Sequence, residues 1–305
     1  MTTCLAELGV TSCDRCRGED ILTRAGDTRA VGELCPHLNA CATCGGSGYV
    51  RGRDADGYEF MRACGRAGIA LRVARFNDAA LPARFHDARL SGYEAAATPG
   101  NNQKAMRGLV EGLRDRLIDA QRSDGSIEPG VRGLGLAGSP GVGKTHLLCA
   151  LTRELTIDFG MAVRYADFSG LLWDLKARFE SGAGEAALLG PLIDADVLVL
   201  DEVGKGKASE WDISIVDALV TGRYNRRKTI VFATNYAFAG DTGSTDLNRA
   251  ALASRSGGGP VAESLRDRVH DRVFSRLAEM CDWVTLVGPD ARRSPAASGN
   301  ARGNR

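Results

Sequence analysis

The sequence lacks long apolar runs and a large charge of one sign. Nowhere in its 305 residues do about 18 apolar residues follow one another, the length that a membrane-spanning helix needs. Residues 1–10 also lack the basic stretch and apolar core of a secretory signal. The formal net charge is only +1, which excludes a uniformly basic surface. We therefore expect a soluble, cytoplasmic protein with no membrane partner, whose nucleic-acid contacts come from a local patch or an assembled ring.

Cysteine is scarce beyond residue 64, where Cys149 and Cys281 stand alone in segments with the composition of a core. The remaining cysteines lie in the first 64 residues, at Cys4, Cys13, Cys16, Cys35, Cys41, Cys44 and Cys64. In a reducing cytosol such clustering favours metal binding over disulfides, and free or redox-active thiols are the alternative.

Six of these cysteines form an internal repeat. Each unit has a Cys-x2-Cys pair and a third cysteine after 18 or 19 intervening residues. The two units consist of Cys13, Cys16 and Cys35, and of Cys41, Cys44 and Cys64. A knuckle with a hairpin that returns to a third ligand is typical of a zinc ribbon, in which Zn²⁺ replaces a hydrophobic core. His37 offers a fourth ligand to the first unit, whereas Arg66 stands at the matching position of the second.

Two ligand groupings fit this repeat. In the first, one zinc is held by the first unit with His37, and a weaker or partner-completed site uses the second unit. In the second, the two knuckles pair into a single four-cysteine site. Segment 41–48 has the C-x-x-C-x-G-x-G pattern and resembles the cysteine-rich domain of DnaJ, in which knuckles do pair.

Composition and motifs divide the chain into four parts. We expect a cysteine-rich zinc-binding domain over 1–70, a linker over 71–104, a nucleotide-binding domain over 105–290 and a disordered tail over 291–305. Apolar residues at helical spacing predict an amphipathic helix over 103–120. The segment 239–260 is rich in Gly, Ser and Asp, which predicts a mobile insertion.

A glycine-rich loop, Gly-Ser-Pro-Gly-Val-Gly-Lys-Thr over 138–145, lies between an apolar run and a helix-like segment. This context makes it a P-loop, whose main-chain N–H groups and helix N-terminus bind phosphate. Lys144 is expected to reach the β- and γ-phosphates of ATP, and the Thr145 hydroxyl to ligate Mg²⁺. The predicted nucleotide-binding residues of this segment are Gly138, Ser139, Pro140, Gly141, Val142, Gly143, Lys144, Thr145 and His146.

Two carboxylates follow the apolar run 197–200, which predicts a buried strand that ends in Asp201 and Glu202. We expect Asp201 to join the Mg²⁺ shell opposite Thr145, and Glu202 to activate the attacking water as a catalytic residue. This pair favours hydrolysis of ATP over phosphoryl transfer to a metabolite. The next buried strand ends at Thr234 and Asn235. One of these polar residues is expected to hold the water near the γ-phosphate, with Asn235 as the first choice and Thr234 as the second.

These motifs occur in an order that resembles the AAA+ helicase loaders of the DnaC/DnaI type and the related IstB transposition helpers. The resemblance rests on the P-loop and on the segments 197–204, 233–235 and 272–277, and it spans about residues 76–292. It implies an α/β fold, a P-loop AAA+ parallel sheet flanked by helices. In this chain a small cysteine-rich, zinc-ribbon-like domain precedes that sheet.

The resemblance also implies intersubunit ATP sites, and hence a homo-oligomer. Arg276, on a helix predicted over 261–280, falls on the family's arginine-finger position, which points at the γ-phosphate of a neighbouring subunit. Arg272 is the near alternative. The cysteine-bearing N-terminal domain resembles that of DnaI, where this domain engages the replicative helicase.

Single-stranded DNA is the expected nucleic-acid partner. We expect it to contact the helix over 167–180 and the loop after it, where charge and a stacking ring are supplied by Lys176, Arg178 and Phe179. Phe179 also fits a core position.

The predicted function is ATP hydrolysis coupled to loading a hexameric replicative DNA helicase onto single-stranded DNA, in replication initiation or restart. One alternative is an IstB-like ATPase that assists DNA transposition, although the elaborate cysteine region favours the loader. The other is a zinc-dependent binding adaptor that holds ATP as a static ligand, and the presence of Glu202 argues against it.

Overall fold

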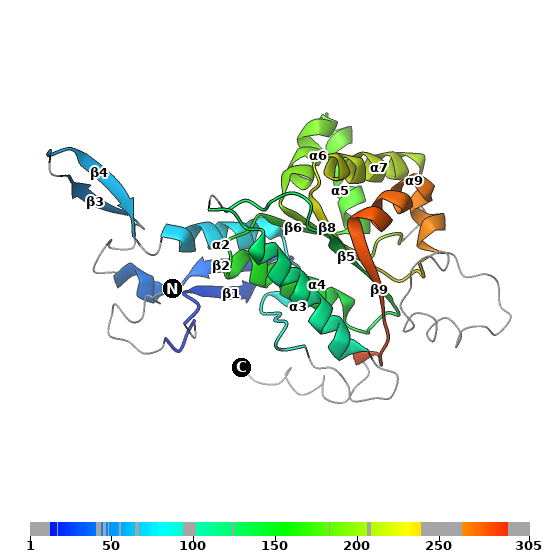
Figure 1. Ribbon diagram of the computed structural model, residues 1–305, viewed down its shortest axis with the longest axis horizontal. Helices are drawn as coiled ribbons and strands as arrows, with labels where there is room; N and C mark the ends of the chain where they lie inside the picture. The colour runs from blue at the N-terminus through cyan, green and yellow to red at the C-terminus, as the bar shows by residue number, and fades with distance from the viewer. Residues whose placement is uncertain are drawn as a thin grey trace.

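Figure 1 shows the computed structural model of the chain. The residues that the structure describes are 13–16, 18–40, 44, 47, 49–54, 56–64, 67–93, 102–123, 125–182, 184–205, 209–238 and 264–291. The insertion expected over 239–260 and, apart from Ala291, the tail expected over 291–305 lie outside them. Cys4, Cys41 and Arg66 also lie outside them.

Five strands of the described chain form one parallel sheet in the order β6-β7-β8-β5-β9. They are β5 (Gly133–Gly138), β6 (Val163–Asp167), β7 (Val197–Asp201), β8 (Thr229–Thr234) and β9 (Cys281–Leu286). Parallel neighbours require a crossover on one face of the sheet, which helices supply here. The predicted α/β class is therefore confirmed, and all carboxyl ends lie at one edge of the sheet.

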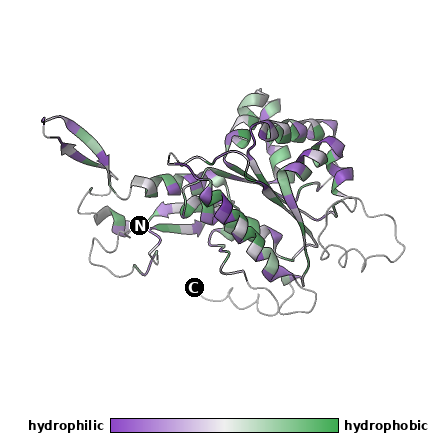
Figure 2. Cartoon of the chain, in the orientation of Figure 1, coloured by the Kyte–Doolittle hydropathy of each residue, from purple (hydrophilic) through white to green (hydrophobic). Residues whose placement is uncertain are grey.

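Helices cover both faces of this sheet (Figure 2). Alternate residues of the inner strands enter two separate cores. One core holds Val199 and Val231 with α3 (Gln103–Asp119) and α4 (Lys144–Ile157). The other holds Leu198 and Phe232 with α5 (Phe168–Glu180), α7 (Glu210–Asn225) and α9 (Leu265–Met280). Because the inner strands β7, β8 and β5 are buried on both faces, they consist mainly of apolar and small residues, whereas the edge strands β6 and β9 also carry polar ones.

Side-chain caps begin the helices of the second core. The Asp167 carboxylate accepts a hydrogen bond from the N–H of Gly170 at 2.8 Å, so the helix predicted after it is confirmed as α5. Ser209 and Ser264 form capping boxes at α7 and α9. The helix predicted over 261–280 is confirmed from Leu265 onward but is interrupted by a kink at His270, where φ is 66°, and residues 261–263 lie outside the described chain.

A buried arginine ties α6 (Glu185–Asp194) to the sheet. Arg223 of α7 is 0% exposed and donates to main-chain carbonyl oxygens. The acceptors belong to Leu192, Ile193, Ala195, Asp196 and Thr229. Burial lowers the pKa of this guanidinium to about 9, so at neutral pH it remains charged. Its five hydrogen bonds satisfy carbonyls at the end of α6 and the start of two strands.

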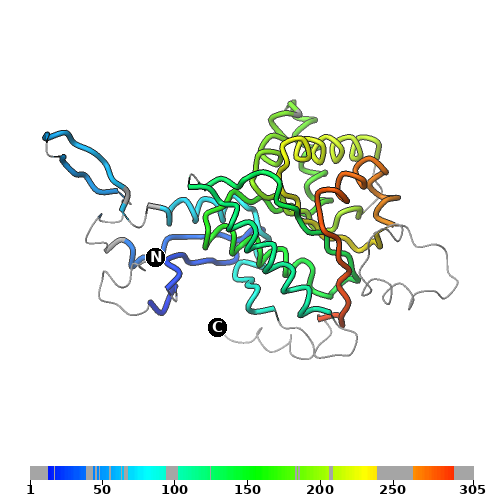
Figure 3. Tube along the Cα trace, in the orientation of Figure 1, coloured from blue at the N-terminus to red at the C-terminus, as the bar shows by residue number. Residues whose placement is uncertain are grey.

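The N-terminal part consists of two antiparallel hairpins. The first joins β1 (Ile21–Ala25) to β2 (Ala30–Leu34), and the second joins β3 (Tyr49–Arg53) to β4 (Glu59–Ala63). A short 3-10 helix, η1 (Pro36–Ala40), lies between the hairpins, and η2 (Ala83–Phe85) follows α2 (Ala67–Ala79). The tube in Figure 3 shows the first hairpin beside α2 and α4 and the second hairpin extending away from them.

The first hairpin shares a core with α2 and α4. The Gly32 N–H donates to Asn77 Oδ1 at 2.7 Å, and Asn77 Nδ2 donates back to the Gly32 carbonyl at 3.1 Å. The Phe76 ring is 0% exposed and lies so close to Gly32 that a Cβ there would come within 2.9 Å of it. Ile21 of β1 belongs to the same buried cluster as the interior of α4. The first hairpin is therefore packed onto the nucleotide-binding region.

Candidate nucleotide and metal sites

The loop between β5 and α4 has the backbone of a phosphate-binding loop. Gly138, Gly141 and Gly143 have φ values of 153°, 84° and 100°, which glycine adopts without strain. Helix α4 begins at Lys144, whose side chain is buried at this turn. Its ammonium donates to the carbonyl oxygens of Gly138 and Ser139 at 2.7 and 2.9 Å, and to Asn235 Oδ1 at 2.8 Å. The structure thus brings the predicted Lys144 and Asn235 into contact.

The outer side of this loop is supported by aromatic and amide groups. The Val142 carbonyl accepts hydrogen bonds from the Tyr93 hydroxyl at 2.8 Å and from Gln103 Nε2 at 3.1 Å. The Tyr93 ring lies against Gly143, and its centroid is 5.6 Å from that of His146. Burial raises the pKa of Tyr93 to about 12, so it remains a donor. Any side chain at position 143 would collide with this ring, a local reason for glycine there.

The two carboxylates at the end of β7 have different surroundings. Asp201 is 3% exposed and its Oδ2 accepts hydrogen bonds from Thr145 Oγ1 at 2.6 Å and from the Tyr165 hydroxyl at 2.9 Å. Burial raises its pKa, and these two hydrogen bonds oppose that effect. A carboxylate beside a hydroxyl is a ligand pair that suits Mg²⁺. Tyr165 was not among the predicted site residues, because its partner lies 36 residues away.

Glu202 has a left-handed backbone, with φ of 56°, which is strained for a residue other than glycine. Its carboxylate forms an ion pair with the Lys205 ammonium. Strain of this kind is typical of functional sites. The predicted water-activating group is therefore held at the edge of the sheet, but in this arrangement it pairs with Lys205.

The arginines predicted for a neighbouring subunit's site lie on α9. Arg276 Nη1 donates to Asp217 Oδ1 of α7 at 2.7 Å, and the Arg272 guanidinium lies 3.4 Å from the same carboxylate. Within the described chain, neither arginine contacts its own P-loop. The sequence offered no signal for Asp217, because a charge on a helix is usually solvated.

Four of the predicted metal ligands come together. The ligand atoms of Cys13, Cys16, Cys35 and His37 all lie within 4.8 Å of one another. Cys16 and Cys35 are 4% and 1% exposed, and His37 Nε2 lies 2.9 Å from Asp20 Oδ1. Three thiols and an imidazole, with a carboxylate behind the imidazole, fit a tetrahedral zinc site. This cluster can therefore hold a zinc ion.

The thiols of the cluster differ in acidity. Main-chain N–H groups of Cys16 and Arg15 lower the pKa of Cys13 to about 6. Burial raises the pKa of Cys35 to about 12. A metal cation is therefore what would hold the Cys35 sulfur as a thiolate at neutral pH.

The remaining cysteines of the repeat do not join this cluster in the described residues. Cys44 and Cys64 are described and lie outside the group of four, whereas Cys41 lies outside the described residues. The arrangement favours the first of the two predicted groupings, in which the first unit completes its site with His37. Whether the second unit holds a metal stays a prediction.

An exposed tryptophan on α5 was not among the predicted contacts. Trp173 is 72% exposed, and Phe179 is 49% exposed with its ring centroid 6.4 Å from that of Trp211. Lys176 and Arg178 are exposed on the same helix. The sequence could have indicated Trp173, because this residue lies outside the apolar face of α5 to which the buried Leu175 belongs.

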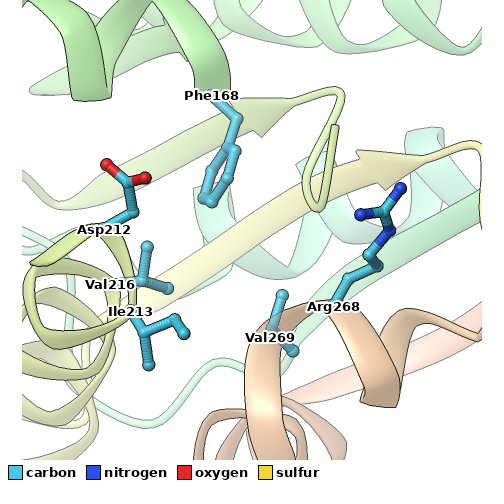
Figure 4. Close-up of a pocket in the computed structure, with 6 residues that line it drawn as sticks. All are labelled: Phe168, Asp212, Ile213, Val216, Arg268 and Val269. Carbon is cyan, nitrogen blue, oxygen red and sulfur yellow. The ribbon is translucent and has the colours of Figure 1, made fainter. Parts of the chain in front are cut away.

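One cavity of the described chain is too small to hold a ligand. Figure 4 shows a cavity between α5, α7 and α9, lined by Phe168, Asp212, Ile213, Val216, Arg268 and Val269. Its volume is about 10 Å³, which is about the space of one water molecule, so it is a packing defect. Among the helices that the structure describes, none combines the length and apolar character needed to span a bilayer.

Residues 110–254 match the family model described as IstB-like ATP binding protein. The replicative helicase loader DnaC of Escherichia coli (strain K12) is 29% identical over 126 residues, which are 41% of this chain and 51% of DnaC. The phage-like element PBSX protein XkdC of Bacillus subtilis (strain 168) is 29% identical over 160 residues, 51% of this chain and 58% of XkdC.

A crystal structure of the DnaC helicase loader aligns at 24% identity over 67% of this chain and 99% of that one, with a TM-score of 0.49. The chain spans about half the length of the curated DnaC relatives that it matches. The family match covers the P-loop, the end of β7 and Asn235, which are the residues that meet at the edge of the sheet. Residues 110–254 therefore form an IstB-like ATP-binding domain, and this part of the chain is similar to the replicative helicase loader DnaC.

Proposed function

We propose that this chain is an ATP-hydrolysing helicase loader, which acts in the cytoplasm on a replicative DNA helicase and single-stranded DNA. The observation that carries the proposal is the meeting of Lys144 with Asn235, and of Thr145 with Asp201, at the carboxyl edge of the sheet. The partner and the loading role are supported by the similarity to DnaC.

The residues divide the chemistry among themselves. The P-loop N–H groups and Lys144 bind the phosphates of ATP, and Thr145 and Asp201 hold Mg²⁺. Glu202 activates the attacking water once its carboxylate leaves Lys205, and Asn235 orients that water. Mg²⁺ when bound neutralises charge on the phosphate oxygens.

The ATP site is completed by a second copy of the chain. Arg276 lies on α9, away from its own P-loop, and it supplies positive charge to the γ-phosphate of a neighbouring subunit. The protein therefore acts as a homo-oligomer with ATP between subunits.

The N-terminal part and α5 supply the other contacts. Zinc bound by the first cysteine unit stabilises the region that docks the helicase, which we take as residues 1–70. Trp173 and Phe179 stack on bases, while Lys176 and Arg178 approach the phosphates of single-stranded DNA.

The test is ATP turnover with a single-stranded oligonucleotide, compared among the wild type, Lys144→Ala, Glu202→Gln and Arg276→Ala. Arg276→Ala should lose about 10³- to 10⁵-fold in stimulated turnover, because a finger acts on the transition state. It should keep its affinity for ATP, measured by equilibrium binding. Arg266→Ala is the matched control, since this α9 arginine pairs with Asp271 on the surface. Full turnover by Arg276→Ala would refute the finger.

The IstB-like match over 110–254 favours a second candidate, an ATPase that assists DNA transposition. Pull-down with the replicative helicase and with a transposase of an IstB-type element separates the two. Retention of the helicase alone supports the loader, and retention of the transposase alone supports the second candidate.

A further inference from the structure

Helix α7 carries an acidic residue that belongs to none of the predicted motifs. Asp217 lies in the middle of this helix, and its side chain is 26% exposed. Its Oδ1 accepts hydrogen bonds from Arg276 Nη1 at 2.7 Å and from Thr221 Oγ1 at 3.3 Å. Its Oδ2 lies 3.4 Å from Arg272 Nη1. One carboxylate therefore contacts both arginines that could serve as the finger.

The two arginines are held to different degrees. The Arg276 side chain is 19% exposed, and its guanidinium carbon is 5.8 Å from the centre of the Tyr224 ring. The Tyr224 hydroxyl in turn donates to the Glu279 carboxylate at 2.9 Å. Arg272 is 69% exposed. Arg276 is thus restrained by both Asp217 and Tyr224, whereas Arg272 is restrained by Asp217 and is otherwise largely exposed.

Apolar packing fixes the distance between Asp217 and the arginines. Val216 and Val220 flank Asp217 on α7 and share a buried cluster with Val269 and Val273 of α9. The carboxylate therefore sits on a rigid element that faces α9, which is where a positioning group is most effective.

We propose that Asp217 is the positioning residue of the arginine finger. By accepting from Nη1, it directs the rest of the Arg276 guanidinium toward the γ-phosphate in the neighbouring subunit's site. A guanidinium has five N–H donors, and in the described part of the chain Asp217 engages Nη1, so Nη2 and Nε remain for phosphate oxygens. Restraint before contact reduces the entropy that Arg276 loses when it meets the phosphate. The inference rests on the proposed intersubunit ATP site.

The first test compares Asp217→Ala with the wild type in the full chain, by steady-state ATP turnover with a single-stranded oligonucleotide. We expect kcat to fall about 10²-fold, the usual effect of a misplaced catalytic group. KM for ATP should stay unchanged, because the P-loop contacts are made by other residues. Asp271→Ala is the matched control: this carboxylate is 76% exposed on α9 and pairs with Arg266, so its removal should leave kcat unchanged.

A mixing experiment separates positioning from misfolding. Asp217→Ala subunits have an intact P-loop, and Lys144→Ala subunits have an intact finger. In a random equal mixture, roughly a quarter of the interfaces combine an intact P-loop with an intact finger. Turnover should therefore recover to roughly a quarter of the wild-type value. A subunit that failed to fold could not be rescued in this way.

The outcomes distinguish this inference from the proposed function. If Arg276→Ala loses turnover while Asp217→Ala keeps the wild-type kcat, Asp217 does not position the finger. If folded Asp217→Ala is inactive but the mixture does not recover, Asp217 acts within its own site and the inference fails. If Arg276→Ala keeps full turnover, Arg276 is not an arginine finger, and the proposed positioning role of Asp217 is refuted as well.

Discussion

Two arginine–glutamate pairs of equal length mark the difference between the cysteine-bearing units. One joins the first unit to α4: Arg153 Nη2 lies 2.8 Å from Glu19, and these side chains are 1% and 23% exposed. The other lies within the β3–β4 hairpin, where Arg53 Nη2 is 2.8 Å from Glu59 and the side chains are 71% and 60% exposed. At equal distance, the surrounding dielectric decides how strongly two charges interact. Breaking the first pair should therefore cost far more than breaking the second.

The buried pair connects the predicted metal ligands to the P-loop helix. The Glu19 N–H donates to the Cys16 carbonyl at 2.9 Å, and Asp20, the next residue, contacts His37. Glu19 also pairs with Arg89, whose carbonyl lies 3.3 Å from His146 Nε2 at the start of α4. The first unit is thus connected to α4, the helix that follows the P-loop.

The second hairpin has a different character. Its strands pack on each other, and Tyr58 and Met61 are 74% and 59% exposed. An isolated two-stranded hairpin is marginally stable in water. We infer that the first unit serves stability and that the hairpin contributes little to it.

The largest expected effect comes from breaking the cluster of Cys13, Cys16, Cys35 and His37, for which we propose zinc. Cys35→Ser should abolish zinc binding by the first unit, and the apparent binding free energy of zinc in such sites is on the order of 10 kcal/mol. Because the unit shares a core with α4, the melting temperature of the ATP-binding region should fall as well. Metal analysis and thermal unfolding measure the two effects. Cys64→Ser, in the second unit, is the control. This variant should still bind the zinc of the first unit, which is the zinc expected to remain bound in the presence of a chelator. Equal zinc loss in both variants would contradict the grouping of four.

A smaller effect is expected from Glu19→Gln, which leaves the Arg153 guanidinium buried beside a neutral group. We expect a loss of about 2–3 kcal/mol in the free energy of unfolding, below the range for fully buried pairs because Glu19 is partly exposed. Urea denaturation of the full chain measures it. No change in the urea midpoint would mean that groups other than Glu19 stabilise the buried Arg153 guanidinium.

The same variant should show a characteristic pH dependence. Burial raises the pKa of Glu19, but Arg89 and Arg153 outweigh it and place the pKa below its ordinary value of 4.5. A lowered pKa in the folded state stabilises the protein fully above pH 4.5, and that contribution is lost as pH falls through the lowered pKa. The stability gap between the wild type and Glu19→Gln should therefore narrow in acid. If the difference in unfolding free energy between the wild type and Glu19→Gln grew as pH fell, that result would contradict the ion pair.

What could be predicted from the sequence was local. The P-loop, the strand before Asp201 and the cap at Asp167 follow from motifs and periodicity within a few residues. The contacts of Asp217 and Glu19 could not be predicted, because their arginine partners lie 59 and 134 residues away. The choice between the two zinc groupings likewise depended on tertiary packing, and the domain boundary near residue 70 stays a prediction.

The smallest expected effect is that of Glu59→Gln in the exposed hairpin. The pair has the same 2.8 Å length as the Glu19 pair, but water screens both partners, so the free energy of unfolding should change by only about 0–0.5 kcal/mol. The substitution is chemically identical to Glu19→Gln, which makes the two variants a matched set under one urea protocol. A large loss for Glu59→Gln would show that the hairpin is anchored in the assembled protein, because only burial could strengthen this pair. An oligomer interface over the hairpin would then have to be sought at concentrations that favour assembly.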